Sequence, residues 1–250
     1  MNKVNKLSKH PKLCKKNIIF WIWQNELHNF LEDLAYWPQS VILIAVFFIF
    51  TSISIGIIEV YPSMHGSMFL ASNLFSGILI VLIAGRYVYT SVSQESGSYW
   101  IMRSGPISLF GWMLRKFSIY FILFAGFGSA SVIFYLKRLR ADKIIIGVSL
   151  MNIIVLALFI TSLGYLYGVI FIDFKENDVW LIASNTGGII FLISGFLSVV
   201  IISISYILPL LIPGKTPEIG FLANITGIYI LLVYIIFRYA TELLRRKDLG

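Results

Sequence analysis

Few residues in this sequence have the types and the spacing that chemistry requires. The strongest candidate is the segment PLLIPGKTPE, in which Gly214, Lys215 and Thr216 match the end of a phosphate-binding loop. The first glycine of that motif would fall at Pro209, and the segment lies between two apolar runs with no predicted strand before it. We therefore interpret the match as chance and expect no nucleotide site of this type.

Motifs of other reactions are missing as well. The sequence contains no HExxH, CxxC or GxSxG pattern and no cluster of His and carboxylate residues, so we predict no catalytic residue, cofactor-binding residue or metal ligand. The single cysteine, Cys14, excludes a disulfide within the chain. The net charge of +8 would suit nucleic acid, but Lys and Arg in the cytoplasmic segments of a membrane protein explain it. We therefore expect no nucleic-acid partner.

The elements that carry these residues are apolar helices. Hydrophobic residues make up 58% of the chain and charged residues 13%, against about 25% charged residues in soluble domains. Each membrane crossing needs about 20 apolar residues. The long apolar runs fall at about 40–58, 67–89, 117–136, 144–172, 181–210 and 220–240. The sequence therefore predicts an all-α integral membrane protein with six transmembrane helices over residues 40–240.

The basic residues predict the orientation of these spans. Six spans put both termini on one side, and fifteen Lys and Arg residues lie in the segments on that side, against five in the loops on the other. Because cytoplasmic segments are enriched in Lys and Arg, we expect both termini in the cytoplasm, including the basic tail 241–250. The basic loop 135–143 on the predicted outer side argues against this orientation, but the terminal segments outweigh it.

The segment before the first span has one apolar face. Within the basic N-terminal residues 1–39, the stretch 18–36 has apolar residues at helical spacing on one side and polar residues on the other. The apolar side consists of Phe20, Trp23, Leu27, Phe30, Leu31 and Leu34. We expect an amphipathic helix in the membrane interface, either as a plain anchor or as an element that also touches a cytoplasmic partner.

The connection between the second and third spans, residues 91–116, mixes charged and aromatic side chains. Gly105 and Pro106 end one short element, and a second begins after them. The residues that could face a cytosolic partner are Glu95, Trp100, Arg103 and Ser108. Long connections usually carry function, so we favour a helix, a break and a second helix at the cytoplasmic interface over an idle interfacial loop.

Small residues recur at helical spacing within the spans, as Gly126 with Ala130 and Gly164 with Gly168. Such positions let helices approach closely, and we expect these faces to need partners, so we predict a dimer. The spans contain almost no ionisable residues. An ion-coupled carrier would normally keep such a residue in the membrane, so its usual machinery is missing.

Three ordered stretches resemble the ABC-2-type exporter permeases. The first is RYVYTSVSQESGSYWIMRSGPIS, with an Arg-aromatic start, a Ser-rich step to Glu, an aromatic-Trp pair and an Arg-Ser-small-Pro turn. The second is NELHNFLEDLAYWPQSVILI, before the first span. The third is LGYLYGVIFIDFKENDVWLIASNTGGIIF, in which Ile172 replaces the usual proline of the family. The chain resembles mainly the second half of longer members, as a half-size permease would.

This resemblance implies a transmembrane permease subunit of an ABC exporter that moves an unidentified substrate. The chain itself would be no enzyme and would bind no cofactor, because a separate subunit would bind and hydrolyse ATP. Its partners would be that ATP-binding-cassette ATPase subunit, a second permease half in a homodimer or heterodimer, and the lipid bilayer. It would be a multi-pass protein of a bacterial cell membrane.

The resemblance also implies roles for two cytoplasmic segments. Residues 91–116 would be the ATPase-coupling element, a cytoplasmic coupling helix. Asp173, Glu176 and Asn177 would form a second contact, although a solvated acidic turn also explains these three residues. The rival hypothesis is a non-transporting membrane scaffold or assembly factor that recruits a cytosolic partner, and an intramembrane enzyme comes third.

Overall fold

The computed structural model describes residues 37–60, 65–95, 109–172, 179–211 and 219–246. The chain divides into two units, Met1–Val41 and Ile42–Gly250. Of the first unit only residues 37–41 are described, as the start of a helix that continues into the second unit. The predicted interfacial helix 18–36 lies outside the described residues, so it stays a prediction.

Every regular element in these ranges is a helix. In chain order they are α2 (Trp37–Val60), α3 (His65–Ser91), the short 3-10 helix η4 (Ser93–Glu95), α5 (Leu109–Arg138), α6 (Lys143–Ile170), α7 (Val179–Ser184), α8 (Thr186–Leu211) and α9 (Ile219–Arg246). Five of them, α3, α5, α6, α8 and α9, are long and apolar enough to cross a membrane. The prediction of a helical membrane protein is thus confirmed at this level. A sixth crossing by α2, which covers the predicted first span, stays a prediction.

Two element boundaries differ from the sequence prediction. The predicted span 181–210 is broken at Asn185 into the short helix α7 and the long helix α8. The second short helix predicted within 91–116 is not a separate element, because residues from Leu109 onward are the first turns of α5. Trp112 and Met113 are already buried there. Burial of α5 therefore begins before residue 117, where the predicted apolar run starts, and the helix itself begins at Leu109.

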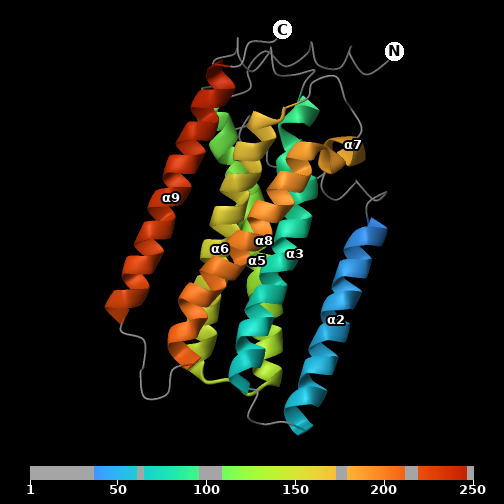
Figure 1. Cartoon of the computed structure of the whole chain (residues 1–250), viewed down its shortest axis with the longest axis vertical. Helices are drawn as coiled ribbons and strands as arrows, with labels where there is room; N and C mark the ends of the chain where they lie inside the picture. The colour runs from blue at the N-terminus through green and yellow to red at the C-terminus, as the bar shows by residue number, and fades with distance from the viewer. Residues whose placement is uncertain (1–36, 61–64, 96–108, 173–178, 212–218, 247–250) are drawn as a thin grey trace, which may run out of the picture. The chain divides into compact units, whose positions relative to one another are not determined.

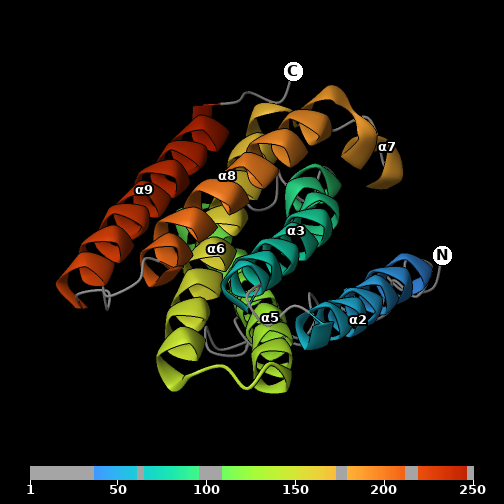
Figure 2. The ribbon, with the colours of Figure 1, turned by 60° about the horizontal axis from the view of Figure 1, so that its bottom comes forward.

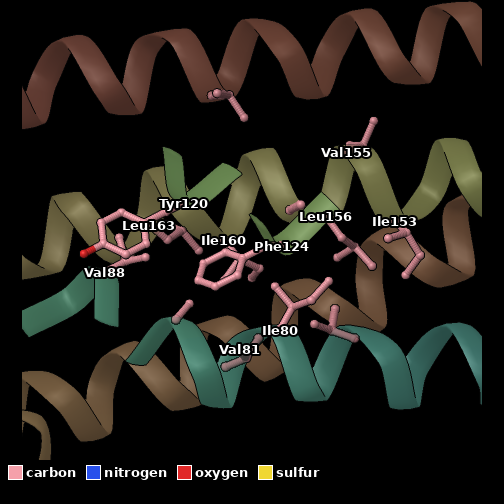
Figure 3. Packing of buried hydrophobic residues seen from close by; sticks show 14 of the residues in the cluster. Ile80, Val81, Val88, Tyr120, Phe124, Ile153, Val155, Leu156, Ile160 and Leu163 are labelled. Carbon is pink, nitrogen blue, oxygen red and sulfur yellow. The ribbon is translucent and has the colours of Figure 1, made fainter. Parts of the chain in front are cut away.

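Helix α6 is the centre of the second unit. It packs against α3, α5, α8 and α9, and both ribbon views show it among these helices (Figure 1, Figure 2). A helix with neighbours on several sides has to be apolar around most of its surface, and α6 is mostly apolar, with a few buried polar residues such as Ser149 and Asn152. Figure 3 shows Leu156 and Ile160 of α6 close to Ile80 and Val81 of α3, with Phe124 of α5 beside them. The buried core thus lies along α6.

Helix α2 meets the bundle through aromatic rings. Phe50 stacks on Phe75 of α3 with ring centroids 4.2 Å apart, and Phe48 meets Phe134 of α5 edge to face at 5.7 Å. Other large apolar side chains of α2, such as Ile49 and Ile53, are exposed. Exposed aliphatic residues of this kind suit contact with lipid chains.

The glycines of α5 and α6 are of two kinds. Gly168 of α6 lies so close to α3 that a Cβ would come within 2.6 Å of the Tyr89 carbonyl oxygen, and a Cβ on Gly164 would come within 2.8 Å of Val88. These two glycines pack within the chain, so the inference that their face needs a second copy is wrong. Gly126 of α5 is exposed and has no atom within 4 Å of a Cβ position, so pairing through that face stays a prediction.

The long helices alternate in direction along the chain. The C-terminal ends of α3, α6 and α9 and the N-terminal ends of α5 and α8 therefore lie at the same end of the unit, together with α7 (Figure 1). The helices joined by residues 96–108 and by residues 173–178 all meet this end. The two segments predicted to contact an ATPase thus connect helices at one end of the bundle.

We expect the substitution Gly168→Ala to destabilise the protein, because the added methyl group would meet the α3 backbone, which cannot move aside as the tip of a flexible side chain can. The expected loss is about 1–3 kcal/mol, as for overpacked cores, measured as the free energy of unfolding by steric trapping in bicelles. Gly147→Ala on the same helix is the matched control, because no atom lies within 4 Å of its Cβ position. Equal stability of the two variants would contradict the close α3–α6 contact.

Candidate functional site

The residues predicted to couple to an ATPase fall mostly outside the described ranges. Glu95 is the last residue of η4. The remaining predicted residues lie in the ranges that the structure does not describe: Trp100, Arg103, Gly105, Pro106, Ser108, Asp173, Glu176 and Asn177. Their roles therefore stay predictions. The structure does describe how the helices on either side of these segments are held.

The C-terminal end of α3 is held by Tyr89. Its hydroxyl group donates a hydrogen bond of 2.6 Å to the side-chain oxygen of Asn185, the residue between α7 and α8. The ring of Tyr89 stacks on Phe191 of α8 with centroids 6.0 Å apart, and its carbonyl oxygen lies against Gly168 of α6. We call this set, completed by Gly187, the Tyr89 junction. It joins α3 to α6, α7 and α8 at the end where the two predicted contact segments begin and end.

Asn185 also accepts a second hydrogen bond within the Tyr89 junction. Its side-chain oxygen also accepts a hydrogen bond of 2.9 Å from the backbone N–H of Gly188, in the first turn of α8. This is the geometry of an N-cap, which satisfies one of the free N–H groups at a helix start. One oxygen atom therefore caps α8 and holds α3 at the same time.

The start of α5 is held by α9. Phe117 meets Phe237 edge to face with centroids 5.0 Å apart, and the hydroxyl of Thr241 donates to the sulfur of Met113 at 3.5 Å. Arg238 of α9 lies over the ring of Phe110, with 5.4 Å from its guanidinium carbon to the centroid. Phe117 also meets Tyr165 of α6 with centroids 6.3 Å apart, so both helices that flank residues 96–108 are anchored and share α6 as a neighbour.

Lys116 is a buried cation near the start of α5. Its side chain is 3% exposed, and its Nζ atom lies 5.0 Å from the centroid of the Trp112 ring. An ammonium group over an indole face is stabilised by the ring quadrupole, which partly replaces lost hydration. The aromatic residues at the start of α5 thus help to hold a positive charge inside the protein.

A polar cluster lies deep inside the bundle. Asn152 of α6 donates to the side-chain oxygen of Asn73 on α3 at 3.0 Å and to the hydroxyl of Ser203 on α8 at 3.4 Å. Asn73 in turn donates to the hydroxyl of Ser149 at 3.1 Å and to the carbonyl of Phe69 at 2.9 Å. The four side chains, which we call the asparagine cluster, are Asn73, Ser149, Asn152 and Ser203, and all are 0% exposed. The cluster links three helices.

The chemistry of the asparagine cluster is hydrogen bonding between neutral groups. Its amides and hydroxyls can position helices or bind a polar group, but they do not exchange protons as a general acid or base would. The cluster was not predicted from the sequence, because only ionisable residues were sought within the spans. A usable signal was present, since an amide in an apolar span is costly unless it is paired with another helix.

We expect Asn73→Ala and Asn152→Ala each to destabilise the bundle by about 1–2 kcal/mol, because each removes hydrogen bonds between helices inside the membrane. The free energy of unfolding in bicelles is the measurement. Asn224→Ala on α9 is the control, because Asn224 is exposed. The double variant should lose less than the sum of the single losses, since the two residues share a hydrogen bond. Full additivity would contradict the link.

Comparison with known proteins places the chain in a family. Neither the curated proteins nor the solved structures contain a match to this chain. The model of one protein family matches residues 11–236, and that family is described as "Putative ATP-binding cassette". The match covers most of the chain, including α2 to α8 and the larger part of α9.

The family description names an ATP-binding cassette, so we tested the described residues for a phosphate site. Such a site needs backbone N–H groups or a helix N-terminus with open space before it. The described helix start with two adjacent glycines is Gly187–Gly188 of α8, where added Cβ atoms would collide with Phe171, the Tyr89 hydroxyl and the Ala183 carbonyl. Protein atoms already fill that space. The glycines at this helix start therefore leave no space for a phosphate group.

The match corrects four expectations drawn from the sequence. The family is described as an ATP-binding cassette, the nucleotide-binding class, and not as an ABC-2-type permease, so the identification as an exporter permease is wrong. The non-transporting scaffold has no support in the match either. The expectation that the chain is no enzyme, and that only a separate subunit binds ATP, is also overturned.

The permease identification rested on three short stretches and the expectation of no ATP binding on the missing Walker motif, whereas the family model matches more than two hundred residues that include the apolar helices. Membership is therefore carried by the sequence as a whole and by no single motif. What the match and the five apolar helices support together is an ABC transporter protein with membrane-spanning helices. The chain belongs to the family of ATP-binding-cassette proteins whose model spans its residues 11–236.

Proposed function

We propose that this chain is a membrane-embedded component of an ABC transporter assembly, and that residues 91–116 pass movement between the nucleotide-binding part of the assembly and the helices. One observation carries the proposal. Both helices that flank residues 96–108 are anchored inside a bundle of apolar helices, α3 at the Tyr89 junction and α5 on α9. A displacement of the segment would therefore act on the bundle directly.

The arrangement of the helices supports a docking site for a partner, and the basic residues support an orientation in the membrane. We propose that an ATP-binding-cassette ATPase subunit docks at the end of the bundle that carries α7, with Glu95, Trp100, Arg103 and Ser108 as contacts and Gly105–Pro106 as the bend between them. Asp173, Glu176 and Asn177 connect helices at that end and form the second proposed contact. The basic residues favour the cytoplasmic side of a cell membrane for this end.

A second copy of the chain is the other proposed partner. The support for it is the exposed face of α5 around Gly126 and Ala130, where another helix backbone could approach closely. The face formed by Gly164 and Gly168 is excluded as a dimer contact, because α3 covers it. The proposed pairing therefore rests on α5.

Photolabelling with an azido-ATP analogue tests where the chain contacts a nucleotide. If the chain binds ATP, as its family description implies, we expect crosslinked peptides that disappear in the presence of excess unlabelled ATP, and the segment 212–218 is one candidate. The segment 212–218 contains Lys215 and Thr216. Mass spectrometry of the purified chain in nanodiscs locates the label, and excess unlabelled ATP is the control. A chain that takes up no competable label would contradict nucleotide binding by the chain itself.

Substitutions in residues 91–116 test the proposed coupling. We expect Trp100→Ala to weaken association with an ATPase partner about thirtyfold, as loss of a contact worth about 2 kcal/mol would. The joint substitution of Glu95 and Arg103 by Ala should weaken association less and lower transport-linked ATPase activity. Membrane insertion should be normal in all variants, because these residues lie between apolar helices.

Lys137→Ala, an exposed charge at the opposite end of α5, is the matched control. Co-purification from membranes and ATPase assays of the complex are the measurements. Unchanged association and coupling in all the 91–116 variants would show that this segment only connects two helices, and would contradict its proposed coupling role.

A further inference from the structure

We propose that Tyr89 is a positioning residue that makes the two contact segments move together. Its hydroxyl fixes the end of α3, which leads into residues 96–108, to the corner between α7 and α8, which follows residues 173–178. The inference rests on the proposed function for the movement of these segments. The hydrogen bond itself is a property of this chain alone and can be measured without a partner.

The first support is the geometry at Asn185. The Asn185 side-chain oxygen accepts from both the Tyr89 hydroxyl and the Gly188 N–H, so the cap of α8 and the hold on α3 share one acceptor. The amides at this corner are further ordered by backbone bonds, from Asn185 N–H to the Ile182 carbonyl at 3.4 Å and from Ile189 N–H to the Asn185 carbonyl at 3.1 Å. Asn185 is therefore a fixed point of the corner.

The second support is that three positions next to Tyr89, on α6 and α8, are glycines and leave space for it. A Cβ on Gly187 would come within 2.5 Å of the Tyr89 hydroxyl, and a Cβ on Gly188 would come within 3.4 Å of its ring. Gly168 of α6 leaves space for the Tyr89 carbonyl in the same way. Three glycines on two other helices thus make room for this one residue, whose side chain is 1% exposed.

The third support is that packing and hydrogen bonding can be separated here. The Tyr89 ring stacks on Phe191, and a phenylalanine at position 89 would keep that stacking and fill the same volume. Only the bond to Asn185 would be lost, while Asn185 would still cap α8. Tyr89→Phe therefore removes the link between α3 and the α7–α8 corner without opening a cavity.

A matched control lies at the other end of α8. Tyr206 is also fully buried, and its hydroxyl shares a hydrogen bond of 2.7 Å with Thr226 of α9. Tyr206→Phe removes the same atom from a similar environment, but far from the two contact segments. A general effect of losing a buried hydroxyl would appear in both variants, whereas the proposed role predicts an effect in Tyr89→Phe alone.

Hydrogen exchange of the full chain in nanodiscs tests the bond. We expect amides at the α7–α8 corner and in η4 to exchange about fivefold faster in Tyr89→Phe than in the wild type, as loss of one buried hydrogen bond would allow. Asn185→Asp keeps an acceptor for both donors and should restore slow exchange relative to Asn185→Ala. Unchanged exchange in Tyr89→Phe, or equal changes in Tyr206→Phe, would overturn the inference.

Spin labels on Gln94 and Ser184 test whether the two segments move together. Both residues are exposed, one on η4 and one on α7, and Cys14 is replaced by Ser before labelling. We expect one narrow distance distribution in the wild type and a broader one in Tyr89→Phe, with Tyr206→Phe unchanged. Equal widths in all three would overturn the inference.

The complex with its ATPase then separates this inference from the proposed function. If the distance broadens in Tyr89→Phe and ATPase coupling falls while association is kept, the positioning role is supported. If the distance broadens but the Trp100→Ala variant binds the ATPase normally, the proposed docking falls and the coupling role of Tyr89 falls with it.

Discussion

The close approach of α3 and α6 is the contact on which the rest of the second unit depends. Inside a bilayer each helix already satisfies its own backbone groups, and apolar side chains gain little by leaving lipid for protein. Association then depends on close packing, which Gly164 and Gly168 permit by leaving space for Val88 and for the Tyr89 carbonyl. Because α6 also packs against α5, α8 and α9, the α3–α6 contact fixes α3 relative to all of them.

Polar side chains in the described helices form hydrogen bonds either within their own helix or to another element. Many buried serines and threonines donate to a carbonyl of the preceding turn of their own helix, as Ser72 does to Phe69 and Thr161 does to Ala157. Asn73, Asn152 and Tyr89 instead reach another element. These three residues link α3, α6 and α8, while Thr241 with Met113 and Tyr206 with Thr226 link α9 to α5 and to α8.

Hydropathy and the spacing of small residues are the two sequence features that predict the helices and their close contacts. The apolar runs gave the helices and their order, because hydrophobic length alone predicts a membrane helix. The break at Asn185 was readable from the sequence SNTGG, which combines a capping residue with two glycines. The partner of each glycine face was not readable, because spacing shows that a helix can approach but not which one. For that reason Gly164 and Gly168 were assigned to a second copy, when α3 covers them.

Family membership was the harder inference, since the chain lacks a complete Walker motif while its family is described as an ATP-binding cassette. The contacts of α3 and α5 indicate which helices a displacement of residues 96–108 would reach. The end of α3 is tied to α6, α7 and α8, and the start of α5 is tied to α6 and α9, because Phe117 meets both Tyr165 and Phe237. Both helices that flank residues 96–108 therefore pack on α6, the central helix of the unit. On the proposed function, the Tyr89 junction passes a movement of the end of α3 on to the corner between α7 and α8.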